Sequence, residues 1–396
     1  MMPISNVNAI EKLTRKLVGA CVNTGTPRTI SEALCCLAEN YGGVFEGKYF
    51  SILGDSISTY AGYIPEGNKV YYTGDNAGVD DVSQTWWSIV GNTLGMNLAV
   101  NNSWSGSKVS DIDASTQDFT PMSDVARCQA LHKESEPLSI TISEGEYYSV
   151  ADGKVAKAAN SNYKAAVIDV NAGESYAINL VAMSANAAYI TAADDDGNVV
   201  ASEITGNGST VAYRDYIFKV PDGATKLYLT CRIRASALDD DLAVKSVIVP
   251  DVIFFWGGAN DFSKANAAIG TWEGGAYPTT ASTFSDAYAL TIKRMQEKYP
   301  AAKIYCLSFP MITRTKSATN GTEYNSENKT IADYNAVIKK MCELFACQYI
   351  DVTGCGITRF NAYPTYCQDS ATVPLHPNKE GMKLYATKII REIEKS

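Results

Sequence analysis

The stretch KYFSILGDSIS, residues 48–58, decides the fold class. Its first half has the length and apolar content of a short buried strand, and the Gly-Asp-Ser string turns directly out of it. A helical apolar spacing follows in SQTWWSIVGNTLG (83–95), then a second strand with its loop in NLAVNNSWSG (97–106), then a second helix in DVARCQALHKE (124–134). This strand–helix rhythm predicts a parallel sheet of α/β type.

The rhythm changes between residues 134 and 249. Short apolar strands such as SYAINLVA and KLYLTCRI alternate there with turns such as NAGE, DDDGN and PDGA, which predicts an all-β sandwich. The α/β pattern resumes at VPDVIFFWGGAND (249–261) and continues through three helices, at 284–299, 331–346 and 378–395, with strands at 302–309 and 348–352. We therefore expect an α/β domain of residues 46–133 plus 250–396, interrupted by a sandwich of residues 134–249. A short helical segment, residues 1–45, precedes it and contains a Thr29–Glu32 capping box.

Composition excludes several classes of protein. The net charge of −9, with scattered Lys and Arg, argues against a nucleic-acid partner, and no apolar run is long enough to span a bilayer. No secretory signal is evident at the N-terminus, so the ten cysteines are expected to be reduced, although Cys355 and Cys367 could pair outside the cell. Two histidines and the absence of CxxC or HExxH make a zinc enzyme an unfavoured reading.

Features of the sandwich have ordinary structural explanations. Its tyrosines could stack on sugars, but aromatic residues in strands are more often core; they are Tyr163, Tyr176, Tyr189, Tyr213, Tyr216 and Tyr228. The runs Asp194–Asp196 and Asp239–Asp241 could hold Ca²⁺, but solvated turns are the favoured interpretation.

Four short motifs fall at loop ends of the α/β region, where ligands of an open parallel sheet bind. Ser56 lies in the first turn, and Gly106 in SWSG follows the second strand, where its backbone N–H could reach a substrate oxygen. Asn260 in GGAND could donate a side-chain amide to an oxyanion, and His376 in LHPN could accept the Ser56 proton as general base. Each motif alone is more often, or equally often, an ordinary turn or cap, and His132 is read as a structural residue.

Together the four motifs resemble the SGNH hydrolases, also called the GDSL esterase/lipase superfamily. Ser56, Gly106, Asn260 and His376 match the four residues from which that family is named. The resemblance implies a flavodoxin-like parallel sheet, a Ser56 nucleophile, a His376 base, an oxyanion hole from Ser56, Gly106 and Asn260, and no cofactor or metal. It covers about 235 residues (88 plus 147) and leaves out the sandwich, which is expected to be jelly-roll-like, and the N-terminal segment.

One departure from the family pattern concerns His376. The last block is usually Asp-x-x-His, but Val373 occupies the acid position here, and its side chain cannot accept a hydrogen bond. A backbone carbonyl near Val373, Asp369 or Glu380 could orient the ring instead. We favour the carbonyl, and therefore a Ser–His dyad, with Asp369 as the possible orienting acid.

The sequence thus predicts a serine esterase that removes small acyl groups, with acetyl on a carbohydrate favoured by analogy to sandwich-type glycan-binding modules. One alternative is a glycan-binding surface or phage-tail adhesion protein with a weakened hydrolase fold, which would place it on a virion or cell surface. The other is a lipase or thioesterase of the same superfamily, which the lack of a long apolar lid disfavours. Oligomeric state and cellular location are not predicted.

Overall fold

The computed structural model describes residues 45–74, 78–112, 118–183, 187–205, 208–233, 242–263, 268–310, 318–319, 322–323, 325, 327–358, 360–370 and 374–395. Three sequence features lie outside these ranges: the N-terminal helices, the run Asp239–Asp241, and Val373.

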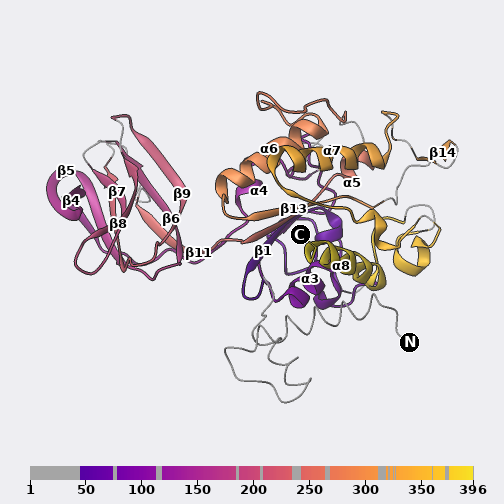
Figure 1. Cartoon of the computed structure of the whole chain (residues 1–396), viewed down its shortest axis with the longest axis horizontal. Coiled ribbons are helices and arrows are strands. Elements are labelled where there is room, and N and C mark those ends of the chain that lie inside the picture. Colours follow the sequence, from indigo (N-terminus) through magenta and orange to yellow (C-terminus); the bar gives the residue numbers. More distant parts are fainter. Residues whose placement is uncertain are drawn as a thin grey trace, which may run out of the picture.

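Five parallel strands form the sheet of the α/β region (Figure 1). In spatial order they are β2 (Asn97–Ser103), β1 (Tyr49–Gly54), β12 (Val252–Trp256), β13 (Lys303–Leu307) and β16 (Gln348–Ile350). Counted along the chain this is the flavodoxin-like order 2-1-3-4-5, as expected. The chain leaves β1 toward β2 on one side and later returns to β12 on the other. The crevice at the carboxyl ends of β1 and β12 is therefore the switch point at which ligands of such sheets bind.

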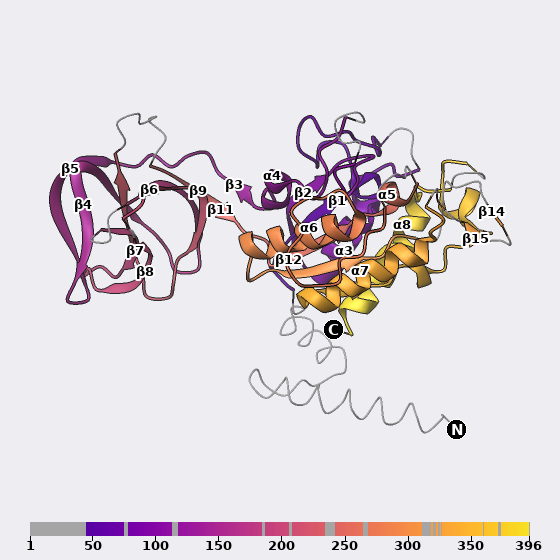
Figure 2. The same cartoon turned by 90° about the horizontal axis from the view of Figure 1, so that it is seen from above.

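Helices cover both faces of this sheet (Figures 1 and 2). One face carries α3 (Trp86–Leu94) and α8 (Lys379–Ile393); the other carries α4 (Val125–Gln129), α6 (Phe284–Lys298) and α7 (Ile331–Phe345). The short α5 (Ala259–Ser263) follows β12, and a small hairpin pairs β14 (Ala318–Thr319) with β15 (Thr322–Glu323). Successive strand residues point to opposite faces, so each face has its own apolar core.

The expected helices agree with the structure, with one correction. Three of them, at α6, α7 and α8, begin and end within about two residues of the expected bounds, and a capping box of Thr330 and Asp333 starts α7. The helix expected over 124–134 is wrong in its second half, because α4 ends at Gln129. Lys133 and Glu134 form β3 instead, since they pair with Ile248 and Val247, more than 100 residues further along the chain.

Two antiparallel sheets pack together in the inserted region. The first contains, in spatial order, β4 (Ile142–Ala151), β5 (Lys154–Asp169), β10 (Lys226–Arg232), β7 (Ala188–Ala193) and β8 (Val199–Thr205). The second contains β3 (Lys133–Glu134), β11 (Ala243–Ile248), β6 (Ser175–Ala182) and β9 (Val211–Lys219). Their inner faces form a third core, which includes the buried Tyr163, Tyr176 and Tyr189. The finer assignment to a jelly roll, and the domain boundaries, remain predictions.

The insert joins the α/β region at the amino ends of its strands. Lys133 pairs with Ile248, so the two connections run side by side. The returning chain enters β12 through Asp251, whose carboxylate accepts the backbone N–H of Tyr49 at 2.9 Å at the start of β1. Ser56 lies past the other end of β1. Six residues at about 3.3 Å each separate the two ends, a distance of about 20 Å.

Candidate active site

Ser56 begins a short 3₁₀ turn, Ser56–Ser58, directly after β1. The Asp55 carboxylate fixes this turn by accepting the backbone N–H of Ile57 at 3.0 Å. Gly54 is required at the end of the strand, because a Cβ there would lie 2.8 Å from Ser103 Oγ and 2.9 Å from Ser58 Oγ. The chain therefore turns sharply at the switch point and places Ser56 at the carboxyl edge of the sheet.

His376 meets Ser56 across 320 residues of sequence. Its Nε2 lies 2.8 Å from Ser56 Oγ, and both residues are buried. Two residues after the histidine, the Asn378 side chain caps α8 by accepting the N–H groups of Glu380 and Gly381. The LHPN motif is therefore a fixed helix start that holds the imidazole against the serine, as a general base requires.

Asp369, not a backbone carbonyl, lies at the other ring nitrogen. Its Oδ1 is 2.9 Å from His376 Nδ1, so the prediction that a backbone carbonyl orients the ring is wrong. Glu380 is not a substitute, because it pairs with Lys383 at 2.9 Å on the surface of α8. The acid therefore stands seven residues before the histidine instead of three.

Antiparallel pairing brings this acid back to the ring. Cys367 bridges to Pro377, Gln368 donates its N–H to His376 O at 3.2 Å, and Asn378 donates its N–H to Tyr366 O at 2.8 Å. These contacts join residues 366–368 to residues 376–378, and Asp369 is the first residue of the loop between them. Its Oδ2 accepts the backbone N–H groups of Leu375 at 3.0 Å and His376 at 2.6 Å.

These contacts keep Asp369 ionised. Burial by itself would raise the pKa of this carboxyl, but the hydrogen bond and charge of His376 and the hydrogen bond from Tyr71 outweigh burial and lower the pKa to about 2. An ionised carboxylate accepts Nδ1–H, which leaves Nε2 as the acceptor for the serine proton.

Gly106 and Asn260 follow the strands on either side of β1. Gly54 is in register with Ser103 of β2 and Trp256 of β12, so all three loops leave the sheet at one edge. Gly106 has a φ of 86°, which favours glycine, and Asn260 is buried and donates Nδ2–H to Ser107 O at 3.0 Å. An amide nitrogen carries two hydrogens, so Asn260 keeps one donor beyond this bond.

Comparison with known proteins agrees with this geometry. Residues 48–187 match the model for GDSL-like Lipase/Acylhydrolase, and residues 205–384 match that for the GDSL-like Lipase/Acylhydrolase family. The chain belongs to this family. Membership in the GDSL-like hydrolases, or SGNH superfamily, supports an ester-bond hydrolase.

Solved structures similar to this GDSL-like hydrolase are remote in sequence. A candidate GDSL-like lipase from Bacteroides ovatus is 18% identical, with 89% of this chain and 100% of that chain covered and a TM-score of 0.44. A carbohydrate acetylesterase from Sinorhizobium meliloti is 9% identical, with 88% and 99% covered and a TM-score of 0.39. A carbohydrate esterase family 2 enzyme with a carbohydrate binding domain, from Corynascus thermopiles, is 13% identical, with 89% and 67% covered and a TM-score of 0.38. No curated protein matches the chain.

Three residues that the sequence analysis missed hold the GDSL-like site together. Asp261 is buried beside Asn260 and accepts the N–H groups of Val109 at 2.8 Å and Ser110 at 2.9 Å, which fixes the loop after Gly106. Its position in GGAND was the available signal. Burial raises the pKa of this carboxyl, and these hydrogen bonds partly offset the effect.

The second missed residue is Arg127 of α4. Its guanidinium donates to Gly54 O at 2.8 Å and Asn102 O at 3.1 Å, so it ties the ends of β1 and β2 to one helix. Burial lowers the pKa of Arg127 to about 10, and this buried cation contacts the carbonyl of Gly54, which lies two residues before Ser56 in the sequence. The third is Tyr71, which contacts both His376 and Asp369. Neither Arg127 nor Tyr71 has a motif that could have revealed it.

The other histidine of this GDSL-like hydrolase lies at the opposite end of the sheet. His132 Nδ1 is 2.9 Å from Tyr299 Oη, and Nε2 is 3.0 Å from Glu134 and 3.2 Å from Asp215 of the sandwich. Among the described residues these three are close enough to share one metal ion. However, the two carboxylates already pair with lysines, Lys245 at Glu134 and Lys298 at Asp215.

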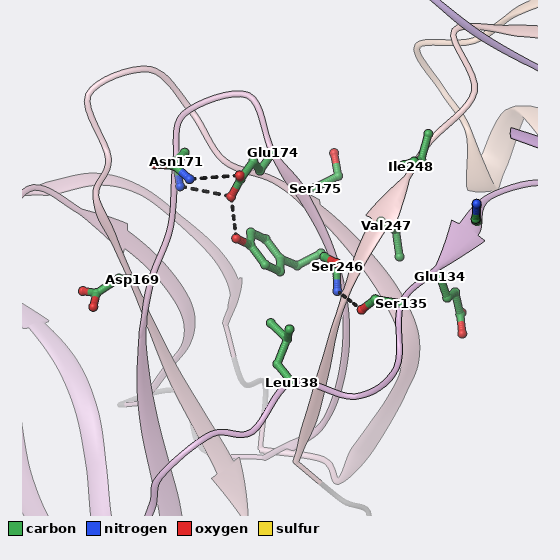
Figure 3. A pocket seen from close by; sticks show the side chains of 12 residues that line it. Glu134, Ser135, Leu138, Asp169, Asn171, Glu174, Ser175, Ser246, Val247 and Ile248 are labelled. Carbon is green, nitrogen blue, oxygen red and sulfur yellow. Dashed lines mark hydrogen bonds between the residues drawn. The ribbon is translucent and has the colours of Figure 1, made fainter. Parts of the chain in front are cut away.

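Cavities also occur at that end. One of about 570 Å³ is lined by apolar side chains, among them Leu138 and Val247, and by polar groups around Glu174 (Figure 3). The Glu174 carboxylate accepts from Asn171 Nδ2 at 2.9 Å and from Tyr176 Oη at 2.6 Å. A second, of about 370 Å³, shares Glu174 and reaches Tyr49 of the α/β region. Both are remote from Ser56.

Other sequence features have structural explanations. Asp194 accepts the N–H of Asp196 at 3.0 Å and of Asn198 at 2.8 Å, so it stabilises a turn. Cys355 and Cys367 are separate thiols. Within the part of the chain that the structure describes, no helix is both long enough and apolar enough to cross a bilayer.

Proposed function

We propose that this GDSL-like hydrolase is a serine esterase in which Ser56, His376 and Asp369 act as a catalytic triad. The observation that carries the proposal is the continuous hydrogen-bonded chain from Ser56 Oγ through the imidazole to Asp369. This complete chain favours an active enzyme over the adhesion protein with a decayed site.

In the first half of the reaction Ser56 Oγ attacks the ester carbonyl while His376 Nε2 takes its proton. The resulting oxyanion would accept hydrogen bonds from the N–H groups of Ser56 and Gly106 and from Asn260 Nδ2. His376 then gives the proton to the leaving alcohol, and an acyl-Ser56 ester remains. A water molecule activated by His376 hydrolyses that ester, releases the acid and restores the serine.

Release of p-nitrophenol from acetate, butyrate and octanoate esters tests this proposal. We expect acetate to react fastest and Ser56→Ala to have no activity above background while keeping its circular dichroism spectrum. Full activity in Ser56→Ala would remove the proposal, and a preference for octanoate would favour the lipase alternative. Ser88→Ala, at a half-buried position on α3 outside the triad, is a matched control and should hydrolyse acetate at the wild-type rate.

We further propose that the natural substrate is an acylated, preferably acetylated, carbohydrate polymer. The carboxylate, amide and hydroxyl groups around the larger cavity suit sugar hydroxyls (Figure 3). That cavity lies in the inserted region, beyond the amino end of β1, and Ser56 lies past the other end of this strand of about 20 Å. A monomer therefore cannot reach both places, but a polymer can.

Removal of the sandwich separates the two halves of the proposal. Joining Lys133 to Pro250 through a short Gly-Ser linker is feasible because Lys133 and Ile248 are cross-strand partners. The truncated protein should hydrolyse p-nitrophenyl acetate within about threefold of wild type, since its triad is at the opposite end of the sheet. It should lose most of its activity on an acetylated polysaccharide; equal activity on the polymer would argue against a glycan-binding role.

A further inference from the structure

Tyr71 connects all three members of the proposed triad. Its backbone N–H donates to Thr59 Oγ1 at 2.9 Å, and that hydroxyl donates to Ser56 O at 3.0 Å. The neighbouring Tyr72 O accepts the N–H of Ala61 at 2.9 Å. The segment with Tyr71 is therefore fixed to the turn that carries the nucleophile.

The Tyr71 side chain contacts the other two members. Its ring stacks on the imidazole of His376, with the centroids 3.5 Å apart and the planes 16° from parallel. Its hydroxyl lies 2.5 Å from Asp369 Oδ1. An ionised carboxylate only accepts hydrogen bonds, so Tyr71 is the donor.

We propose that Tyr71 is a positioning residue that sets the orientation and the charge of His376, through its ring face on the imidazole and its hydroxyl on Asp369. This inference rests on the proposed esterase mechanism, in which His376 becomes positively charged when it takes the serine proton.

The ring and the hydroxyl act on that charge in opposite directions. The face of an aromatic ring is negative, so stacking stabilises the imidazolium relative to the neutral imidazole. The hydroxyl instead donates a hydrogen bond to Asp369, which partly offsets the negative charge of this carboxylate and weakens its attraction for the imidazolium. The ring should thus favour protonation of His376, and the hydroxyl should limit it.

Few other titratable groups surround His376 among the described residues. Tyr72 presents its ring edge to the imidazole at 6.4 Å, and its hydroxyl donates to Pro377 O at 2.9 Å. The Cys367 thiol is near Asp369, and burial raises its pKa to about 12, so it stays neutral together with Tyr72, whose pKa burial also raises. The charged group in direct contact with the imidazole is Asp369.

NMR titration of the His376 ring in the full-length protein tests the proposal directly. The chain has only two histidines, so His132→Gln assigns the signals. Tyr71→Phe keeps the ring and loses the donor, and the titration midpoint of His376 should rise by about 0.5 pH unit. Tyr71→Leu loses both, and its midpoint should lie about 0.5 to 1 unit below that of Tyr71→Phe.

Tyr72→Phe is the matched control, because it removes a neighbouring hydroxyl that does not touch Asp369; its midpoint should stay within about 0.2 unit of wild type. Midpoints that coincide in wild type, Tyr71→Phe and Tyr71→Leu would overturn the proposal. If Tyr71→Leu does not fold, an unchanged midpoint in Tyr71→Phe is sufficient to overturn it.

Kinetics on p-nitrophenyl acetate give a second measurement. We expect kcat to fall about 3- to 10-fold in Tyr71→Phe and about 10- to 100-fold in Tyr71→Leu, with KM unchanged. A change confined to KM would mean that Tyr71 binds substrate, and would contradict a positioning role. Shifted midpoints in a protein with no esterase activity would instead refute the proposed function and leave the Tyr71–His376 coupling in place.

Discussion

The two histidines of this chain lie at opposite ends of the same parallel sheet and have similar neighbours. Each is buried, and each has a carboxylate and a tyrosine in contact with its ring. They differ in what faces Nε2: a serine hydroxyl at His376, and two carboxylates already paired with lysines at His132. A histidine beside an acid is therefore not yet a base for catalysis, because it also needs a proton donor on its second nitrogen.

The largest expected effect is the contrast between the two histidines themselves. His376→Ala should lower kcat on p-nitrophenyl acetate by about 10⁴-fold or more, since no other described group could take the Ser56 proton. His132→Gln should leave kcat/KM within about threefold and lower the thermal midpoint instead, because it loosens the contact with Asp215. A large activity loss in His132→Gln, at a temperature where the protein is folded, would break the comparison.

The next largest contrast in kcat is expected between substitutions of the two carboxylates, Asp369 and Glu134. Asp369→Asn should lower kcat by about 10³- to 10⁴-fold, because an amide at Nδ1 no longer selects the tautomer that accepts the serine proton. Glu134→Gln makes the same change beside His132 and should leave kcat unchanged. If Asp369→Asn kept activity within a few-fold, the site would operate as a dyad despite the observed contact.

Asn260→Ala should have a smaller effect, a loss in kcat of about 10²- to 10³-fold, which is usual for one oxyanion-hole donor. The protein should fold, because the hydrogen bond that is lost among the described residues is the one to Ser107 O. Initial rates across substrate concentrations would check this, and a change in KM alone would assign Asn260 to substrate binding.

The smallest expected difference between the two ends of the sheet is in how low pH affects the stability of the protein. The pKa of Asp369 and that of Asp215 are both lowered to about 2, although burial alone would raise them; His376 and Tyr71 outweigh it at Asp369, and His132 and Lys298 at Asp215. A folded pKa below the ordinary 3.8 stabilises the protein above about pH 4, and the contribution is lost as pH falls toward 2.

In urea unfolding at pH 6, the free energy of unfolding should therefore be about 2 kcal/mol below wild type for Asp369→Asn and about 1 kcal/mol below wild type for Asp215→Asn. The second value is smaller because Asp215 is more exposed. Both deficits should vanish near pH 2. A destabilisation that does not change with pH would mean that the substitution disturbs packing and not a charge interaction. Activity at pH 7 should separate the two variants, because only Asp369 contacts His376.

Much of this site was evident from the sequence. Local patterns determined the strands and helices, since apolar periodicity and capping residues act over a few residues. The GDS, SWSG, GGAND and LHPN motifs pointed to Ser56, Gly106, Asn260 and His376. A turn after a strand places each of the first three, and the start of α8 places His376. The order of the motifs was sufficient for the family, and the family match agrees.

Contacts between distant segments were decided only by the tertiary structure. Lys133 and Glu134 continue a helical pattern but form a strand, because Ile248 and Val247, more than 100 residues away, complete their hydrogen bonds. Asp369 reaches His376 because Cys367 pairs with Pro377, and Tyr71 reaches both because its loop is tied to the Ser56 turn. None of these pairings leaves a periodic trace in the sequence, since a hydrogen bond between loops depends on where two chain segments meet in space and not on the spacing within either.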